Sequence, residues 1–447
     1  MINSFVKLAA LMALANAAPA SSPNSNSGTL KVDFTRRVEN VASSPDPNQP
    51  YNPGKAGSTP HANLKNHLIY YDTNITIGTP PQQFTVDLDT GSSDLWVAAD
   101  GSKGAYNPKK SSTYQDYKPG FGISYGDGSH ASGDWVKDTV TFGGASVPQF
   151  VFAAASSVNS ELQIFGIGYT GNEASNYQSE QNGQTFQYDN FPIRLAKDGV
   201  IDTPAYSLFL DSLDSSTGSV LFGGVDTSKF SGDLAILKTL AEDGQTKPKE
   251  FLVTLDSVDV EVNGKTHNAL DKTRHVLLDS GTTLTYLPTE TYKTLINALG
   301  IYDDYNYGPG ATKSQIDKLK EQKAVVAYKF QGKKIEVPVS ELFILATDRK
   351  NNQVYVQSEG KTEEYYSLLV GDGGDGDLYD PPPPDVIALG QADYSKTEGS
   401  IEQIKKDSIP SATSATGATW SINHPITTSA SDGPNANAFT LAPKPTA

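Results

Sequence analysis

Two stretches of the chain repeat one short pattern, and this repeat limits the possible folds more than any other feature. Residues 85–96 read TVDLDTGSSDLW and residues 276–287 read VLLDSGTTLTYL. In each, mostly apolar residues lead into Asp, a small hydroxyl residue, Gly and then Ser or Thr, so that Asp89 aligns with Asp279. We interpret the chain as two copies of one half-site, neither of which can work alone.

The repeated pattern has a definite chemistry. An apolar strand that ends in Asp-x-Gly puts a carboxylate on a tight turn, where glycine permits backbone geometry that other residues resist. Two such carboxyls brought together share one proton, because close like charges do not both ionise cheaply. A water between them meets a base and an acid at once, so it can attack a peptide carbonyl. The pattern therefore predicts hydrolysis without a metal, a cofactor or a covalent intermediate.

A second echo supports the duplication. The segments QIFGIG at 163–168 and VIALG at 386–390 each place two apolar residues before a glycine, downstream of their own Asp loop. We expect each segment to form a strand that passes behind the Asp-bearing strand and supports it.

Composition narrows the class of protein. A length of 447 residues suggests two or three domains, and Gly 39, Pro 27 and Tyr 22 favour strands and turns over helices. The net charge of −16 argues against nucleic acid and anionic membranes as partners. Cysteine is absent, so the chain has neither disulfides nor a thiolate nucleophile. The six histidines lack ligand spacing, and we expect no metal site.

The ends of the chain indicate secretion as a precursor. Residues 1–17 have the Lys, apolar run and Ala-x-Ala site of a signal peptide. Residues 18–66 are polar and are expected to form a flexible propeptide, in which Arg36-Arg37 is either a processing site or part of a charged coil. Residues 407–447 form a Ser/Thr-rich tail that we expect to be disordered. No later apolar run approaches the roughly 20 residues of a membrane span.

Between these ends the pattern is mainly β. Alternation around Gly-Thr-Pro-Pro predicts a hairpin from residue 68, and this hairpin carries the sequon at Asn74, a candidate glycosylation site. Helical periodicity is best at 191–200, 289–300 and 315–325.

The chain resembles the pepsin-like aspartic proteases, and within them the secreted yeast enzymes of the candidapepsin kind. The likeness covers roughly residues 67–405 and rests on DTGSSDLWV, ISYGDGSHASGDWVKDTVTFGG, YSLFLDSLDSSTGSVLFGGVDTSKFSGDL and VLLDSGTTLTYLP. It implies a bilobal β fold, with lobes at 67–236 and 237–406 and a cleft between them. It also implies a monomer that binds extended peptide segments and acts at acidic pH.

The resemblance assigns roles residue by residue. Asp89 and Asp279 match the catalytic pair, and Ser92 and Thr282 match the hydroxyls that hydrogen-bond their carboxylates. Tyr125 matches the tyrosine of the mobile hairpin that covers a bound peptide, with Asp127 near the tip of the hairpin. Trp96 matches the tryptophan that steadies this tyrosine. By the same resemblance, the residues that support the catalytic pair are Thr90, Ser92, Trp96 and Ser280. The residues that bind substrate are Tyr125, Gly126, Asp127, Gly91, Gly281, Thr282 and Thr283.

Other motifs compete with this interpretation. Gly122 to Gly126 fits the serine-hydrolase elbow G-x-S-x-G with Ser124 as nucleophile, but turn and strand residues follow it where a helix is required. The acidic run 371–380 lacks the spacing of a calcium loop.

The chain also departs from the family near its end. After Leu389-Gly390 it lacks on the order of ten residues of a strand that the family has, and the loss of a core strand costs several kcal/mol of stability. The alternative function is therefore a pepsin-fold protein that binds peptides, or sits in the cell wall, without turnover.

Overall fold

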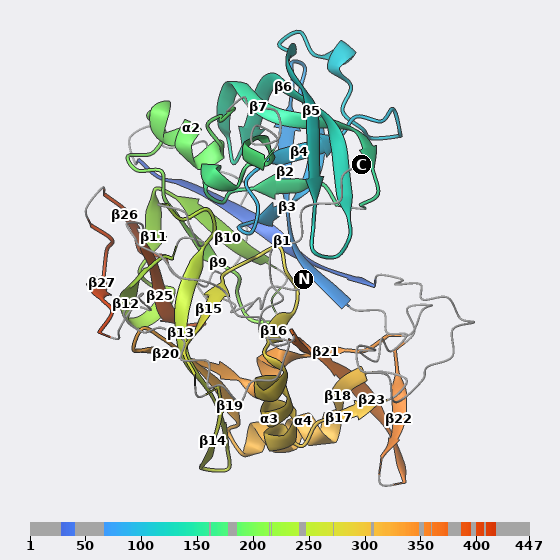
Figure 1. Cartoon of the computed structure of the whole chain (residues 1–447), viewed down its shortest axis with the longest axis vertical. Coiled ribbons are helices and arrows are strands. Elements are labelled where there is room, and N and C mark those ends of the chain that lie inside the picture. The colour runs from blue at the N-terminus through green and yellow to red at the C-terminus, as the bar shows by residue number, and fades with distance from the viewer. Residues whose placement is uncertain are drawn as a thin grey trace, which may run out of the picture.

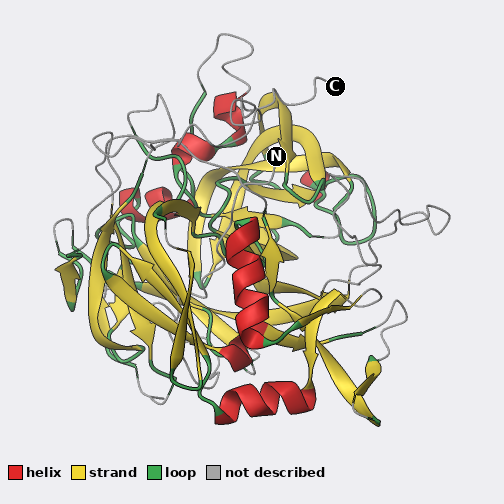
Figure 2. Cartoon of the chain, turned by 60° about the horizontal axis from the view of Figure 1, so that its bottom comes forward, coloured by secondary structure: helices red, strands yellow, loops and turns green. Residues whose placement is uncertain are grey.

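Strands dominate the protein. The computed structural model describes residues 28–40, 67–160, 162–177, 186–213, 215, 217–240, 247–270, 272–304, 308–347, 353–358, 360–373, 386–394, 399–405 and 408–416. Figure 2 shows a few helices against a background of strands, which confirms the predicted mainly β, bilobal fold. Among the described residues, no helix has the length and apolarity that crossing a bilayer requires.

The first half of the chain forms one large sheet, drawn from blue to green in the upper and middle parts of Figure 1. Its strand order is β5-β6-β7-β4-β8-β3-β2-β1-β10-β9. The predicted hairpin is confirmed, because β2 pairs antiparallel with β3. The strands are β1 (Leu30–Asn40), β2 (His67–Ile77), β3 (Gln82–Asp89), β4 (Leu95–Ala98), β5 (Gln115–Ser124), β6 (His130–Phe142), β7 (Ala145–Val158), β8 (Ile164–Gly166), β9 (Tyr206–Phe209) and β10 (Thr217–Phe222).

Strand β1 corrects the expectation that residues 18–66 form a flexible segment throughout. It lies between β2 and β10 and pairs antiparallel with both. Leu30, Val32 and Phe34 alternate with polar residues, and Leu30 and Phe34 are buried in the core of the first half. Such period-two alternation is typical of a half-buried strand. The expectation was wrong here because the average polarity of the segment hid a short local pattern.

The second half is built from several smaller sheets, drawn from yellow to orange in the lower part of Figure 1. One has the order β14-β13-β19-β20 with β15 on β13, one pairs β16 with β24, and one has the order β17-β18-β23-β21 with β22 on β23. The strands are β13 (Leu252–Val262), β14 (Lys265–Leu270), β15 (Arg274–Leu277), β16 (Thr285–Leu287), β17 (Tyr302–Asp304), β18 (Gly308–Thr312), β19 (Val325–Phe330), β20 (Lys333–Pro338), β21 (Phe343–Leu345), β22 (Tyr355–Ser358), β23 (Lys361–Leu368) and β24 (Val370–Asp372).

Two further sheets join early and late parts of the chain. In one, β12 lies between β25 and β27, and in the other β11 pairs with β26. Their strands are β11 (Gly224–Asp226), β12 (Phe230–Lys238), β25 (Val386–Ala392), β26 (Ile401–Gln403) and β27 (Ala412–Ser414). Strand β27 pairs parallel with β12, so the expectation that all of residues 407–447 are disordered is wrong for its first part, because β12 offers an open edge to an extended segment.

The three predicted helices are present. They are α2 (Phe191–Lys197), α3 (Thr289–Leu299) and α4 (Lys313–Glu321), with short 3-10 turns η1 (Pro108–Lys110), η2 (Thr170–Asn172) and η3 (Val339–Leu342). A capping box starts α4, since the Thr312 hydroxyl accepts from the Gln315 amide and the Gln315 side chain accepts from the Thr312 amide. The left-handed Gly300 ends α3.

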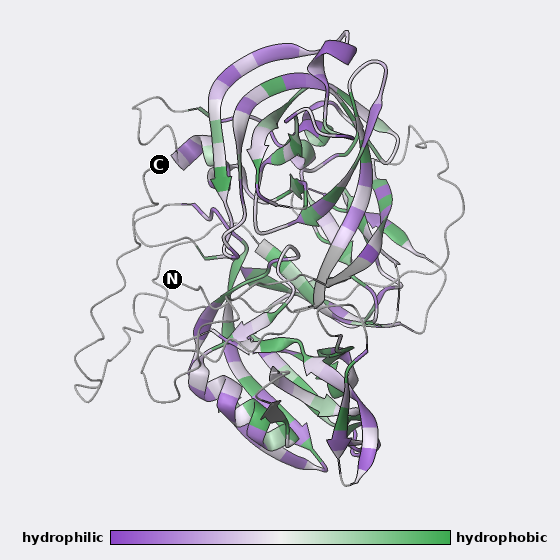
Figure 3. Ribbon diagram, turned by 90° about the vertical axis from the view of Figure 1, so that its right-hand side faces the viewer, coloured by the Kyte–Doolittle hydropathy of each residue, from purple (hydrophilic) through white to green (hydrophobic). Residues whose placement is uncertain are grey.

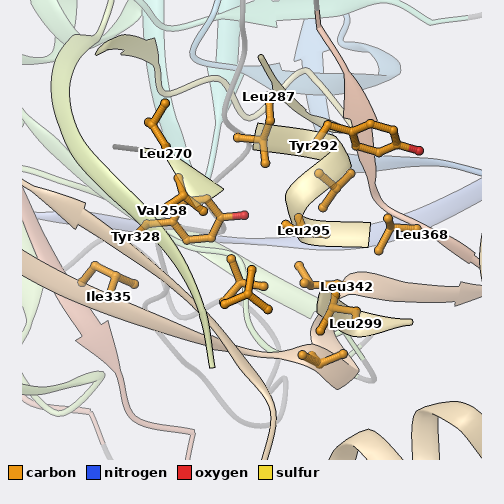
Figure 4. Close-up of a cluster of buried hydrophobic side chains, with 14 of the residues drawn as sticks. Val258, Leu270, Leu287, Tyr292, Leu295, Leu299, Tyr328, Ile335, Leu342 and Leu368 are labelled. Atoms are coloured by element: carbon orange, nitrogen blue, oxygen red, sulfur yellow. The ribbon is translucent and has the colours of Figure 1, made fainter. Parts of the chain in front are cut away.

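Each half has its own hydrophobic core. Green and purple bands alternate along the long strands in Figure 3, as expected for strands with one buried face. Figure 4 shows the core of the second half, where side chains of α3 meet those of β13 and β19. A chain without cysteine is thus held together by packing in these two large cores and in smaller clusters, such as the one around Trp96 and Trp135.

The predicted supporting strands behave differently in the two halves. Strand β8 pairs parallel with β3, with Asp89 opposite Gly166, as expected. Strand β25 instead pairs antiparallel with β12, from Phe230↔Ala392 to Lys238↔Val386. The expectation that residues 386–390 lie behind the second Asp strand is therefore wrong for this structure. The physical reason is that β12 offers β25 six paired positions, whereas β8 has three on β3 in the first half.

Candidate active site

The first Asp loop begins where β3 ends. Asp89 is only 5% exposed, at the end of a strand whose last residues are buried. The Gly91 amide donates to its Oδ1 at 2.7 Å, and the Ser92 hydroxyl donates to its Oδ2. These two donors fix the plane of the carboxyl group, as the sequence pattern predicts.

The second Asp loop repeats this arrangement. The Gly281 amide donates to Oδ1 of Asp279 at 2.8 Å, and the Thr282 hydroxyl donates to its Oδ2. The aligned sequences therefore give matched hydrogen bonds, donor for donor.

A reciprocal set of hydrogen bonds joins the two loops. The Thr90 amide donates to Oγ of Ser280 at 3.1 Å, and the Ser280 amide donates to Oγ1 of Thr90 at 2.9 Å. Each hydroxyl also donates across to the strand before the opposite aspartate, at 3.2 Å to the Leu278 carbonyl and 2.8 Å to the Leu88 carbonyl. Both hydroxyls are buried, so each bond replaces a lost contact with water. These four hydrogen bonds, called the reciprocal grip below, hold the two Asp loops face to face.

The two carboxyl groups lie close together as a result. A Cβ at Gly91 would lie only 2.5 Å from Oδ1 of Asp279, and a Cβ at Gly281 would meet Oδ1 of Asp89. Burial, the negative charge of Asp279 and a hydrogen bond between the carboxyls raise the pKa of Asp89 well above its ordinary value, against the lowering effect of the Ser92 hydroxyl. At a pH at which two separate surface carboxyls would both be ionised, this pair can still hold one proton.

The hairpin of β5 and β6 reaches over this pair. The Trp96 indole donates to Oη of Tyr125 at 2.7 Å, which is the contact that the resemblance implies. Burial and the nearby negative charge of Asp89 raise the pKa of Tyr125, so the hydroxyl lies within electrostatic reach of the carboxyl pair. The hairpin also excludes the serine-hydrolase motif, because Ser124 is followed by a turn and β6.

The tip of the hairpin is open. A Cβ at Gly126 would meet nothing within 4 Å, and Asp127 is exposed, with its Oδ1 accepting from the Ser129 amide at 2.8 Å. The charge of Asp127 raises the pKa of Tyr286, after burial, and so connects the tip with the second half. Thr283 is buried and lines a cavity behind the second Asp loop.

Two other predicted sites lie away from the carboxyl pair. Asn74 is exposed on β2, where its side chain accepts from the Thr85 hydroxyl at 3.0 Å, and glycosylation there stays a prediction. Arg36 and Arg37 lie within β1, opposite Tyr71 and Tyr70 of β2. Cleavage at Arg37 requires local separation of β1 from β2, and processing at this pair stays a prediction.

A buried acidic cluster beside the first loop was not predicted from the sequence. Asp94 is fully buried, and its carboxylate accepts from the Tyr188 hydroxyl at 2.5 Å and from the Ala174 amide at 2.7 Å. Glu173 is also fully buried, and burial and the charge of Asp94 raise its pKa to about 9. The signal that could have found Asp94 is an acid directly before the buried Leu-Trp of TGSSDLW. Within the described residues, no three metal-binding side chains come together.

Comparisons with known proteins agree with this geometry. Residues 70–373 match the family model for eukaryotic aspartyl protease, which ends before β25. An acid protease from Saccharomycopsis fibuligera is 37% identical over 381 residues, covering 82% of this chain and 90% of that protein. Secreted aspartic protease 1 of Candida albicans is 39% identical over 310 residues, covering 65% of this chain and 73% of the relative.

Candidapepsin-3 of Candida albicans is 35% identical over 374 residues, covering 80% of this chain and 87% of the relative. Among solved structures, the aspartic proteinase from Irpex lacteus matches with a TM-score of 0.57 and 20% identity, over 73% of this chain and 95% of that one. That likeness bears on the fold alone. The extent of the sequence matches, together with the paired Asp loops, shows that this chain belongs to the eukaryotic aspartyl protease family and is an aspartic endopeptidase.

Proposed function

We propose that this enzyme is a secreted endopeptidase that cleaves proteins at acidic pH with a water activated by Asp89 and Asp279. The ionised member of the pair takes a proton from the water as the water oxygen attacks the peptide carbonyl carbon. The protonated member gives its proton to the carbonyl oxygen, which yields a tetrahedral diol. Collapse of the diol breaks the C–N bond, and the amine leaves with a proton from the pair.

The observation that carries this proposal is the reciprocal grip between Thr90 and Ser280. It holds two carboxyls, each with one amide and one hydroxyl donor, close enough to share a proton. A preorganised acid and base of this kind need no rearrangement at the moment of reaction. A purely structural turn would require neither the cross-links nor the repeated donors.

An acidic medium suits this arrangement. The raised pKa of Asp89 means that the pair keeps one proton to a higher pH than an ordinary aspartate would. Loss of that proton at higher pH removes the acid, and gain of a second proton at very low pH removes the base. We expect kcat/KM to show a bell-shaped dependence on pH. The two apparent pKa values that limit it belong to the pair and not to either aspartate alone.

The substrate is proposed to be an extended peptide segment lying between the carboxyl pair and the hairpin. Tyr125 covers it, Trp96 holds Tyr125 in place, and Gly126 and Asp127 face it from the hairpin tip. The backbone and side chains around Gly91, Gly281, Thr282 and Thr283 face it from the loops. The exposed, unobstructed tip at Gly126 supports a hairpin that can open for a folded chain end or loop.

We further propose that the enzyme is made as a precursor, exported by residues 1–17 and active as a monomer. The pairing of β1 with β2 and β10 supports a precursor in which part of the 18–66 segment packs on the enzyme. Relatives named secreted aspartic proteases support export. Residues 1–17 and 417–447 lie outside the described residues.

The test is cleavage of an acid-denatured protein by the full chain, with and without a statine-type inhibitor. We expect inhibitor-sensitive cleavage that Asp89→Asn or Asp279→Asn removes, while Asp233→Asn, at an exposed residue of β12, has no effect. Ser124→Ala is expected to leave cleavage unchanged. Loss of cleavage in this variant would indicate serine-hydrolase chemistry instead.

The second candidate is a peptide-binding protein without turnover, favoured by the displaced β25. It predicts that a folded, processed sample binds the inhibitor but cleaves nothing at any pH from about 2 to 7. That result would contradict the endopeptidase proposal.

A further inference from the structure

Strand β1 lies in the interior of the large sheet, although it begins before the predicted cleavage site at Arg37. It has six paired positions with β10 and six with β2. The residues up to Arg37 hold all six pairs with β10 and three of those with β2. A segment cut off after Arg37 would therefore keep most of its backbone partners.

One face of β1 belongs to the core of the first half. Leu30 and Phe34 are each 3% exposed, and Val32 packs against the same hydrophobic cluster. The Phe34 ring meets the Tyr71 ring of β2 edge to face, with the ring centroids 5.2 Å apart. Departure of the strand would leave a hole in this core or expose its lining to water, and both outcomes are costly to stability. The rest of the enzyme therefore needs a strand at this place.

Two glycines outside β1 leave room for its side chains. A Cβ at Gly218 of β10 would overlap the Phe34 ring, whose Cζ would lie 2.5 Å away, and would also crowd the Phe209 carbonyl. A Cβ at Gly143 would overlap Cγ2 of Val32. Larger residues at both positions would fill the space that Val32 and Phe34 occupy. The surface that receives β1 thus matches this strand in shape as well as in backbone pairing.

Arg36 attaches the strand close to the predicted cleavage site. Its Nη1 donates to the Ser212 carbonyl at 2.9 Å. Its side chain also lines a partly open pocket together with Asp211 and Glu341, and Glu341 belongs to η3 in the second half. Carboxylates near a partly buried guanidinium attract it more strongly than they would in bulk water. Arg36 therefore holds the strand at a place to which both halves of the molecule contribute.

The sequence between the cleavage site and β2 has no pattern that could replace β1. A replacement needs large apolar side chains two residues apart, as Val32 and Phe34 are, so that both face the same core. Residues 38–66 read VENVASSPDPNQPYNPGKAGSTPHANLKN. Their prolines cannot donate backbone hydrogen bonds inside a sheet. The clearest apolar pair at this spacing is Ala62 and Leu64, and the methyl group of Ala62 is too small to fill the place of either β1 side chain.

We propose that β1 remains in the sheet after processing, so that one mature enzyme molecule consists of two chains without a covalent link between them. The occupant of the site between β2 and β10 is the severed segment of this same chain, which ends at Arg37. A protease that recognises basic pairs hydrolyses the Arg37–Val38 peptide bond, which consumes one water and leaves a carboxyl group on Arg37 and an amino group on Val38. A cut further on, up to residue 66, leaves β1 in the same place. This inference rests on the proposed maturation of a precursor and is independent of the catalytic step.

An engineered cut tests the proposal without relying on the natural processing site. Residues 47–53 of the full chain are replaced by the recognition sequence of a viral protease, and the purified protein is cut and passed through a gel-filtration column. We expect the segment that contains Phe34 to elute with the rest of the enzyme in a one-to-one ratio, measured by mass spectrometry, and to separate from it only in denaturant. Elution of a folded, inhibitor-binding enzyme without that segment would overturn the proposal.

The naturally processed enzyme gives a second measurement. The full chain is expressed for secretion, and the processed sample is compared by native and denaturing mass spectrometry. We expect two masses in denaturant and their sum under native conditions, and a processed enzyme whose native mass lacks the β1 segment would overturn the proposal. A chain that stays uncut would contradict the proposed processing, and a folded chain that cleaves nothing would contradict the proposed function. In both cases the engineered cut still shows whether β1 stays bound.

The stability of the cut enzyme shows whether β1 is still part of its core. Phe34→Ala should lower the thermal midpoint of the cut protein by several degrees, and Phe34→Leu should lower it less, because the ring fills space in the core. Thr35→Ala is the matched control, since Thr35 is exposed at the next position of the same strand and the change should leave the midpoint unaltered. If β1 leaves after the cut, all three variants would have the midpoint of the cut wild-type sequence, and that result would overturn the proposal.

Discussion

The two Asp loops are near copies in their hydrogen bonds but differ in what lies behind them. Each carboxyl receives one glycine amide and one hydroxyl, and the two loops exchange matched bonds through Thr90 and Ser280. Strand β8 supports the first loop, whereas β25 pairs with β12 and leaves a cavity behind the second. The four-residue motif and the hydrogen bonds between Thr90 and Ser280 are therefore enough to set the geometry of the two carboxyl groups. This geometry does not require a supporting strand behind both loops.

The loops also differ in the charge packed beside them. Asp94, five residues after the first aspartate, is fully buried with Glu173, whereas the aligned position in the second half is Leu284. A buried pair of acids costs folding energy unless one of them keeps its proton. The stability of the first half is therefore expected to depend on the protonation of Glu173.

The largest expected effect tests whether the two carboxyls are equal. Asp89→Asn and Asp279→Asn each remove a member of the proton-sharing pair, so each should lower kcat by about 10²–10⁴-fold. The two losses should agree within about tenfold despite the different support behind the loops. Steady-state cleavage of a peptide at the optimal pH measures both. An Asp279→Asn enzyme with near-normal kcat would show that the first loop works alone.

The next effect compares the two supporting glycines. Gly166→Ala places a methyl against backbone atoms and should lower the free energy of unfolding by about 3 kcal/mol. Gly390→Ala meets a side chain that can move, so its change should stay below about 1 kcal/mol. Urea unfolding measures both. Equal losses of stability for the two variants would show that backbone crowding does not distinguish the two glycines.

A smaller effect concerns the buried acid of the first half. The pKa of Glu173 is raised to about 9 in the folded chain, whereas an unfolded glutamate has a pKa near 4.5. The unfolded state therefore loses this proton first as pH rises. Stability is lost between about pH 4.5 and 9, by at most about 1.4 kcal/mol per pH unit. Urea unfolding at pH 5 and pH 7 should show a smaller decline for Glu173→Gln, and equal declines would exclude Glu173 as the cause.

The smallest effect compares Tyr125 in the first half with Tyr286 in the second half, whose pKa is raised by burial and by the charge of Asp127. Tyr125→Phe removes the hydrogen bond from Trp96, worth about 1 kcal/mol, and should lower kcat/KM about fivefold. Tyr286, aligned with Trp96, should tolerate phenylalanine within about twofold. Parallel measurement of kcat/KM for one peptide decides the order. A greater loss for Tyr286→Phe would reverse the roles of the two halves.

Much of the site could be predicted from local sequence. The doubled motif gave the donors to each carboxyl, and the pairing of Trp96 with Tyr125 followed the resemblance. Strand β1 was missed because its alternation covers only a few residues of a polar segment. The cluster of Asp94 and Glu173 was missed because its members are far apart in the chain, and burial raises their energetic importance only after folding.

By itself the sequence determined the two Asp loops, the main β strands and the three helices, because backbone periodicity and short-range donors act within a few residues. The tertiary structure alone decided which strand β25 pairs with. The apolar residues of 386–390 do not specify a partner, since any extended segment offers the same backbone groups to whichever strand edge is open. The choice depends on the competing edges and packing that only the folded chain provides.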